Sequence, residues 1–112
     1  MRTVDSIMEY FEKAVKEKRI LSPHEWVEGA QYANILIGDE TDKLFESQQT
    51  LNILKRDYIE EYGTVAKAKV FTEVTDEYKD YCKQKAKIDR VIEFIRIAKL
   101  QARLRNEEFK SY

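Results

Sequence analysis

The sequence predicts an all-α protein, a long antiparallel helical hairpin preceded by a short N-terminal helix. The first observation behind this prediction is composition: 112 residues with three glycines, one proline and 37% charged residues fit a charge-laced helical protein. The second is spacing, because apolar residues recur every three or four positions, the period of a helix. The third is a set of helix start and stop signals that divide the chain. A chain of this length is expected to form one domain.

Residues 1–21 are expected to form the N-terminal helix and the link that follows it. The apolar residues of this helix recur at helical spacing, and they are Val4, Ile7, Phe11, Ala14 and Val15. Thr3 is a suitable N-cap, because its hydroxyl can accept a hydrogen bond from a first-turn amide. A stripe this narrow needs another helix to pack on.

A second helix is expected over 22–62, and it begins at the clearest boundary signal in the chain. Ser22 as N-cap, Pro23 as the first helical residue and Glu25 two residues later form a capping box. In such a box the serine hydroxyl accepts from the Glu25 amide, and the Glu25 carboxylate reaches back to the Ser22 amide.

Two alternatives are open for the middle of the second helix. The helical spacing of apolar residues continues across Gly38, which favours one continuous helix. Gly38 as a C-cap and Thr41 or Asp39 as a new N-cap would instead break the helix at 38–42. The continuous helix is the preferred prediction, because one interior glycine costs only about 1 kcal/mol.

A tight turn at Gly63 and Thr64 separates the two arms of the hairpin. Gly63 suits the left-handed conformation that ends many helices, and the Thr64 hydroxyl can cap the next helix. So short a connection predicts antiparallel arms at about 23–62 and 65–108.

The last helical segment, 64–109, has a weak middle and an apolar second half. Thr72, Thr75 and Asp76 lower the helical propensity and mark a place where the helix can bend. Over 88–100 the apolar residues cover more than one face, so we expect this part to pack on two sides, against the N-terminal helix, a second copy of the chain, or both. Because a slender hairpin exposes much surface, a coiled-coil-like homo-oligomer is expected.

The sequence contains no recognisable constellation for catalysis or metal binding. His24, the only histidine, falls in the first turn of a helix, and Cys82, the only cysteine, is expected to be a small core or boundary side chain. The neighbouring carboxylates of Asp39 and Glu40 would point about 100° apart on a helix, so we expect them to be solvated. These observations predict a non-enzymatic protein with no catalytic residue, no cofactor and no metal.

No stretch of the chain predicts membrane insertion or secretion. The apolar runs are far shorter than the roughly 20 residues that span a bilayer. The N-terminus carries Asp5, Glu9 and Glu12 where a secretory signal would be apolar. We therefore expect a cytoplasmic protein without a membrane partner.

Charge is unevenly distributed along the chain, although the formal net charge is only −1. Residues 79–112 hold ten Lys and Arg against five Asp and Glu, whereas residues 1–78 hold ten against sixteen. Such asymmetry indicates either a polyanion-binding end or charge complementarity between packed helices or subunits.

Four cations of the basic end form the candidate site for a polyanion or a partner, and they are Lys85, Arg96, Lys99 and Arg103. The last three follow one another at spacings of three and four, so they project from one helix face over about two turns. Cations in such a row can contact phosphates without reading sequence. Two alternatives are open: pairing with acidic residues of the first half, or contact with a protein partner. The candidate acidic partners are Glu25, Glu28, Asp39 and Glu40.

Five stretches of the chain resemble small helical accessory proteins of tailed bacteriophages and prophages. They are WVEGA at 26–30, DKL at 42–44, GTVAKAK at 63–69, TDEY at 75–78 and IRIAKLQAR at 95–103. Genes for such proteins often lie among replication and recombination genes. The resemblance, which spans about 23–108, implies a non-enzymatic factor of DNA replication or recombination in the host cytoplasm. Such a factor would act as an oligomeric helical scaffold that contacts DNA or a DNA-processing protein.

An alternative function is open at this point. The acidic half of the chain would suit a protein-directed inhibitor or modulator of a host factor, for example one that acts against host defence. A protein partner is expected under both hypotheses, and nucleic acid is a possible ligand under the first.

Overall fold

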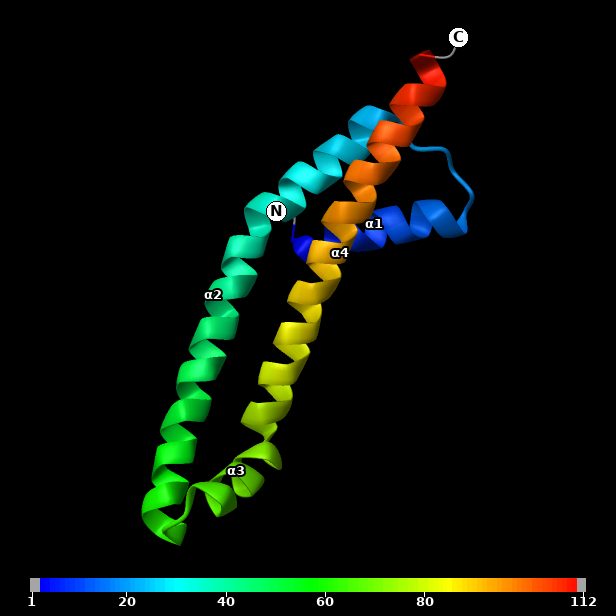
Figure 1. Ribbon diagram of the computed structural model, residues 1–112. Helices are drawn as coiled ribbons and strands as arrows, with labels where there is room; N and C mark the ends of the chain where they lie inside the picture. The colour runs from blue at the N-terminus through cyan, green and yellow to red at the C-terminus, as the bar shows by residue number, and fades with distance from the viewer. Residues whose placement is uncertain (1–2, 111–112) are drawn as a thin grey trace. The chain divides into compact units, whose positions relative to one another are not determined.

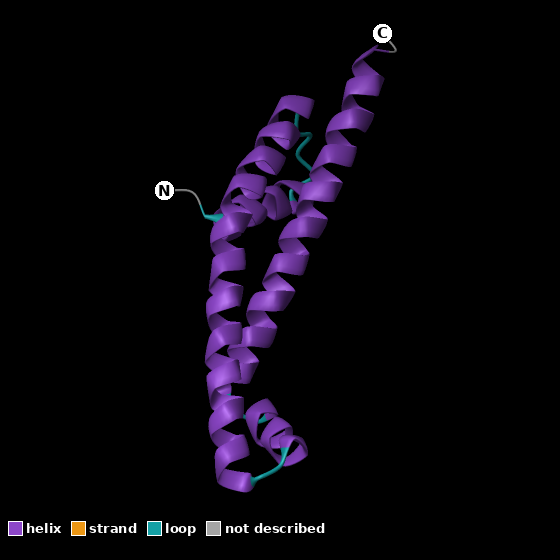
Figure 2. Cartoon of the chain, turned by 60° about the vertical axis from the view of Figure 1, so that its left-hand side comes forward, coloured by secondary structure: helices purple, strands orange, loops and turns teal. Residues whose placement is uncertain are grey.

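The computed structural model describes residues 3–110, and it describes the side chains of residues 3–105. The described residues form the helices α1 (Val4–Lys16), α2 (Pro23–Tyr62), α3 (Val65–Glu73) and α4 (Asp76–Lys110) (Figure 1). None of residues 3–110 forms a strand, and helices account for nearly all of the cartoon in Figure 2. The long helices α2 and α4 pack against each other as a hairpin. The predicted all-α hairpin with a short N-terminal helix is therefore confirmed.

Local capping explains where the first two helices begin. The Thr3 hydroxyl accepts from the Ser6 amide at 3.1 Å, as predicted for the N-cap of α1. At the start of α2 the Ser22 hydroxyl accepts from the Glu25 amide at 3.1 Å. The Ser22 hydroxyl in turn donates to the Glu25 carboxylate at 3.4 Å. The Glu25 carboxylate thus pairs with the Ser22 hydroxyl, whereas the predicted capping box pairs it with the Ser22 amide.

The helix α2 runs without interruption through Gly38, in agreement with the preferred alternative. It ends before Gly63, which adopts a φ of 78°, the left-handed conformation that glycine tolerates best. The Thr64 hydroxyl then accepts from the Lys67 amide at 3.3 Å and begins α3. Both turn residues therefore have the roles that the sequence predicts.

The second arm is not one helix over 64–109, because α3 and α4 are separated at Val74 and Thr75. The Thr75 hydroxyl donates to the Thr72 carbonyl at 2.7 Å and accepts from the Tyr78 amide at 3.2 Å. These local bonds compete with the helical ladder and give α4 a new N-cap. The sequence predicts a possible bend here, and the structure has a complete interruption of the helix.

The chain divides into two compact units: unit 1 comprises residues 1–38 and 89–112, and unit 2 comprises residues 39–88. In unit 1, Phe11 of α1 joins the three helices. Its ring centroid lies 4.7 Å from that of Trp26 on α2 and 5.2 Å from that of Phe94 on α4. The buried core residues around it are Val4, Ile7, Ala14, Leu21, Ala30, Ala33, Val91, Ile95, Ala98 and Ala102. The apolar second half of α4 therefore packs on α1 as well as on α2, as expected.

Gly29 allows α1 to approach α2 closely. A Cβ atom at this position would lie closer than 3.0 Å to two ring atoms of Phe11, a separation that real Cβ atoms essentially never show. The Phe11 ring is itself buried among Trp26 and Phe94, so it has little room to move. The missing side chain is a packing requirement of unit 1.

Unit 2 contains a buried carboxylate where the sequence predicts a solvated one. Glu40 is only 5% exposed. Its carboxylate accepts from Gln84 Nε2 at 2.7 Å and from Lys87 Nζ at 3.1 Å, and Gln84 Nε2 also donates to the Glu40 carbonyl at 2.8 Å. Nζ of Lys43, an exposed side chain, lies 3.6 Å from the same carboxylate. The prediction of a solvated Glu40 is wrong, because the partners that make its burial tolerable lie on α4, more than forty residues along the chain.

The packing of unit 1 makes opposite predictions for the two glycines inside α2. Gly29→Ala is expected to lower the free energy of unfolding by about 1–3 kcal/mol, because the added methyl overpacks Phe11. The matched control is Gly38→Ala, since nothing lies within 4 Å of the position where its Cβ would be. That variant is expected to raise the free energy of unfolding by about 0.5–1 kcal/mol through helix propensity. Urea titrations of both variants measure the effect, and equal signs would contradict the packing of unit 1.

The Glu40 network gives the stability of unit 2 a pH dependence. Burial alone raises the pKa of the Glu40 carboxyl, but hydrogen bonds from Gln84 and Lys87 and the charges of Lys87 and Lys43 lower it below its ordinary value of 4.5. A carboxyl with a lowered folded-state pKa contributes stability above its unfolded pKa, and this contribution is lost as the pH falls through the folded pKa.

Lys87→Met is therefore expected to lower the free energy of unfolding at neutral pH by about 1–3 kcal/mol, because it leaves a buried carboxylate undercompensated. The difference from wild type, measured by urea titration, should shrink as the pH falls below 4.5. Lys43→Met is the control: the Lys43 side chain is 61% exposed, so we expect a change within about 1 kcal/mol. A Lys87→Met effect that grew on acidification would disprove the assigned network.

Candidate polyanion-binding face

The candidate cations of unit 1 lie beside the buried stripe of α4. The buried residues recur at spacings of four, three and four, and they are Val91, Ile95, Ala98 and Ala102. Each cation follows one of the last three directly in sequence, and the cations are Arg96, Lys99 and Arg103. One residue along a helix turns the side chain by about 100°, so packing of the buried stripe leaves the cations exposed in a second row.

We call this second row, Arg96, Lys99 and Arg103, the basic face. Together with the half-buried Leu100 it lines an open hollow of about 420 Å³. Residues 89–105 contain five cations and two anions, so this stretch of α4 carries net positive charge. A surface of this kind can hold an anionic group by charge and offer an apolar contact beside it.

Arg96 is paired within its own helix. Its Nε donates to both carboxylate oxygens of Glu93, at 3.2 and 3.1 Å, and Nη2 makes a further short contact with the same carboxylate. The hydrogen bonds from Arg96 lower the pKa of the Glu93 carboxyl, and the same pair raises the pKa of Arg96. Both side chains are more than half exposed, so water screens this pair and an anionic ligand can compete for the guanidinium.

Lys99 and Arg103 are exposed, and neither has an ion-pair partner among the described side chains of residues 3–105. Arg96 pairs with Glu93 of its own helix. The first-half carboxylate of Glu40 does pair with the basic end of the chain, but its partner there is Lys87, which is not one of the four candidate cations, and its second partner is Lys43. Two cations of the basic face therefore present their charge to solvent.

Lys85 differs from the other three candidate residues. It is exposed on α4 as they are, but it belongs to unit 2, whereas the basic face belongs to unit 1. The structure thus gathers three of the four candidate cations around one hollow.

The other singled-out residues do not form a reactive site with the basic face. His24 is exposed in the first turn of α2, with its Nε2 3.8 Å from a Glu28 carboxylate oxygen. Cys82 is exposed, so its prediction as a core or boundary residue is wrong. It falls between the more deeply packed positions Tyr81 and Gln84, on the solvent side of α4. A hydrogen bond with Cys82 is the main cause that raises the pKa of Tyr78.

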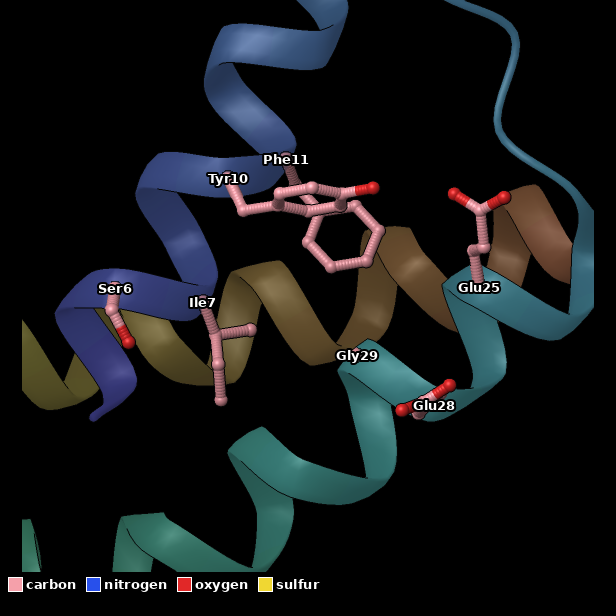
Figure 3. Close-up of a pocket in the computed structure, with 7 residues that line it drawn as sticks. All are labelled: Ser6, Ile7, Tyr10, Phe11, Glu25, Glu28 and Gly29. Carbon is pink, nitrogen blue, oxygen red and sulfur yellow. The ribbon is translucent and has the colours of Figure 1, made fainter. Parts of the chain in front are cut away.

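A second hollow of unit 1, which the sequence did not predict, lies between α1 and the start of α2 (Figure 3). Its volume is about 370 Å³, and we call it the α1–α2 pocket. The residues that line it are Ser6, Ile7, Tyr10 and Phe11 from α1 and Glu25, Glu28 and Gly29 from α2. Periodicity within one helix cannot reveal such a pocket, because it exists only when the two helices pack. The glycine inside a helical stretch was the one available signal.

Comparison with protein-family models, with curated proteins and with solved structures finds no significant match to this chain. Within the described residues, no helix combines the length and the apolar character needed to cross a membrane.

Proposed function

We propose that the protein binds the phosphate backbone of nucleic acid through the basic face of α4. The observation that carries this proposal is the exposure of Lys99 and Arg103 on one helix face, without an ion-pair partner among the described side chains of residues 3–105. An internal ion pair would neutralise these charges and hinder contact with a ligand. Because both side chains are exposed, they can contact an external polyanion.

The chemistry of the two cations suits phosphate. Lys99 and Arg103 are four residues apart, which separates them by about 6 Å along the helix axis. The Arg103 guanidinium can donate two parallel hydrogen bonds to one phosphate, whereas the Lys99 ammonium acts as a compact point charge. Leu100 adds an apolar contact beside them. Contacts with phosphate carry no sequence information, so binding through them is expected to be independent of sequence and sensitive to salt.

Arg96 would join the other two cations when ligand is present. Its exposed pair with Glu93 is weak enough for a phosphate to replace the carboxylate. In the absence of ligand the pair holds the guanidinium in place and neutralises part of the face. Glu93 is therefore a built-in competitor of the anionic ligand.

The role that such binding would serve is that of a non-enzymatic accessory factor in DNA replication or recombination, which is also what the resemblance to phage proteins implies. Self-association would raise the effective affinity, since several weak basic faces on one particle act together. The second candidate function is modulation of a host protein through the acidic half. The two carboxylates that line the α1–α2 pocket, Glu25 and Glu28, favour it.

A binding assay across a salt series tests the proposed function. Lys99→Ala combined with Arg103→Ala is expected to weaken binding of single-stranded and double-stranded oligonucleotides. On duplex DNA the slope of log affinity against log salt should become shallower by about 2, one for each lost phosphate contact. Fluorescence anisotropy with labelled oligonucleotides of unrelated sequence gives both quantities.

The matched control is Lys79→Ala combined with Lys83→Ala, which removes the same charge from exposed positions of α4 in unit 2. This control is expected to keep most of the wild-type affinity and slope. If the two double variants lose affinity equally, the basic face is not the binding site. If wild type binds no oligonucleotide at low salt, direct nucleic-acid binding is excluded.

Glu93→Gln tests the competitor role of the carboxylate. Removing its charge releases Arg96 and makes the basic face more positive, so nucleic-acid affinity should rise by a few fold at low salt. The same anisotropy assay measures the gain, with Asp80→Asn as a charge-matched control on α4 in unit 2. An affinity that falls in Glu93→Gln would mean that the carboxylate supports binding by orienting Arg96, rather than opposing it.

A further inference from the structure

The α1–α2 pocket has the size and lining of a small-ligand site. Its volume of about 370 Å³ falls within the range of about 300–1,000 Å³ that such sites occupy in proteins. Ser6, Ile7 and the aromatic residues Tyr10 and Phe11 form its α1 wall. Gly29 leaves the opposite wall without a side chain at one point. The α1 wall is therefore mainly apolar.

The charge in this pocket is negative. Glu25 and Glu28 are the charged residues among its lining, and Figure 3 shows both carboxylates on the α2 side. The Glu25 carboxylate accepts a long hydrogen bond of 3.4 Å from Ser22, and a Glu28 oxygen lies 3.8 Å from the exposed His24 imidazole. No Lys or Arg is among the residues that line the pocket.

The aromatic wall adds a second attraction for positive charge. The negative face of a tyrosine ring attracts a guanidinium or ammonium group. The Tyr10 ring already makes such a contact within the protein, because Arg19 Cζ lies 5.4 Å from its centroid. The Tyr10 side chain is nevertheless accessible, since the residue is 47% exposed. Phe11 contacts Tyr10 edge to face, with centroids 5.4 Å apart, and this contact steadies the ring.

From these features we propose that the α1–α2 pocket binds an organic cation, namely a guanidinium or alkylammonium head on a short apolar stem. The head lies between the Glu25 and Glu28 carboxylates and the Tyr10 ring, and the stem contacts Ile7. Either a free small molecule or a basic side chain of another protein offers this chemistry. This site is separate from the basic face, which attracts the opposite charge.

A titration followed by amide chemical shifts tests this proposal, with the Gly29 amide as a reporter inside the pocket. The probes are n-propylguanidinium and N-acetyl-arginine-N-methylamide, and the neutral control is N-acetyl-citrulline-N-methylamide, which has nearly the same shape as the capped arginine without the charge. We expect saturable shifts at Gly29 and Tyr10 with both cationic probes and none with the neutral one. Equal binding of the neutral probe, or no shift with either cation, would overturn the proposal.

Variants locate the site. Glu28→Gln and Tyr10→Ala are each expected to weaken binding of the cationic probes about fivefold or more, because one removes a carboxylate charge and the other the ring. Tyr10→Phe keeps the ring and should keep the affinity. Glu9→Gln is the control for charge, since Glu9 is exposed on α1 and does not line the pocket. Unchanged affinity in both Glu28→Gln and Tyr10→Ala, at wild-type thermal stability, would place the cation elsewhere.

The two cationic probes also separate the sources of the ligand. Tighter binding of the capped arginine than of n-propylguanidinium, which has the same charge, indicates that peptide groups flanking the side chain are recognised, as expected for a protein partner. Tighter binding of n-propylguanidinium indicates a free small cation. This titration is independent of nucleic acid, so its failure would leave the proposed function of the basic face intact.

Discussion

The contact between Phe11 and Gly29 is the constraint on which unit 1 depends. Because Gly29 has no side chain, the Phe11 ring can lie directly against α2 and still contact Trp26 and Phe94. This packing fixes which face of α4 is buried, and the basic face is exposed as a result. The α1–α2 pocket lies beside the same ring. One close approach between helices thus positions both candidate binding surfaces.

In unit 2 the pairing of α2 with α4 involves a polar residue, Glu40, within an otherwise apolar stripe. On α2 the packed positions recur as Trp26, Ala30, Ala33, Ile37, Glu40, Leu44 and Leu51, and Glu40 takes the place of an apolar residue in this series. On α4, Gln84 precedes Ile88, Val91 and Ile95 at the same spacing. A buried carboxylate is costly without its donors, so we infer that the Glu40 network disfavours other registers of the two helices.

The sequence was sufficient to predict features that depend on neighbouring residues. The caps at Thr3, Ser22 and Thr64 and the left-handed Gly63 all follow from short-range hydrogen bonding and backbone sterics. It was insufficient where a distant residue decides the outcome. Glu40 was expected in solvent, and the α1–α2 pocket was not predicted, because Gly29 by itself does not show which helix packs against it. The basic face lies between these cases. Spacing predicted that Arg96, Lys99 and Arg103 share a face, but only the structure places Lys85 in another unit and pairs Arg96 with Glu93.

The proposed function of the protein depends on contact between the basic face of α4 and nucleic acid. Amide chemical shifts recorded during titration with a short single-stranded oligonucleotide test it most directly, because they identify the contact surface without any substitution. We expect the largest shifts within 96–103 and little effect on residues 79–85 of the same helix. Shifts concentrated on α1 and the first turns of α2, or spread evenly over the chain, would contradict it.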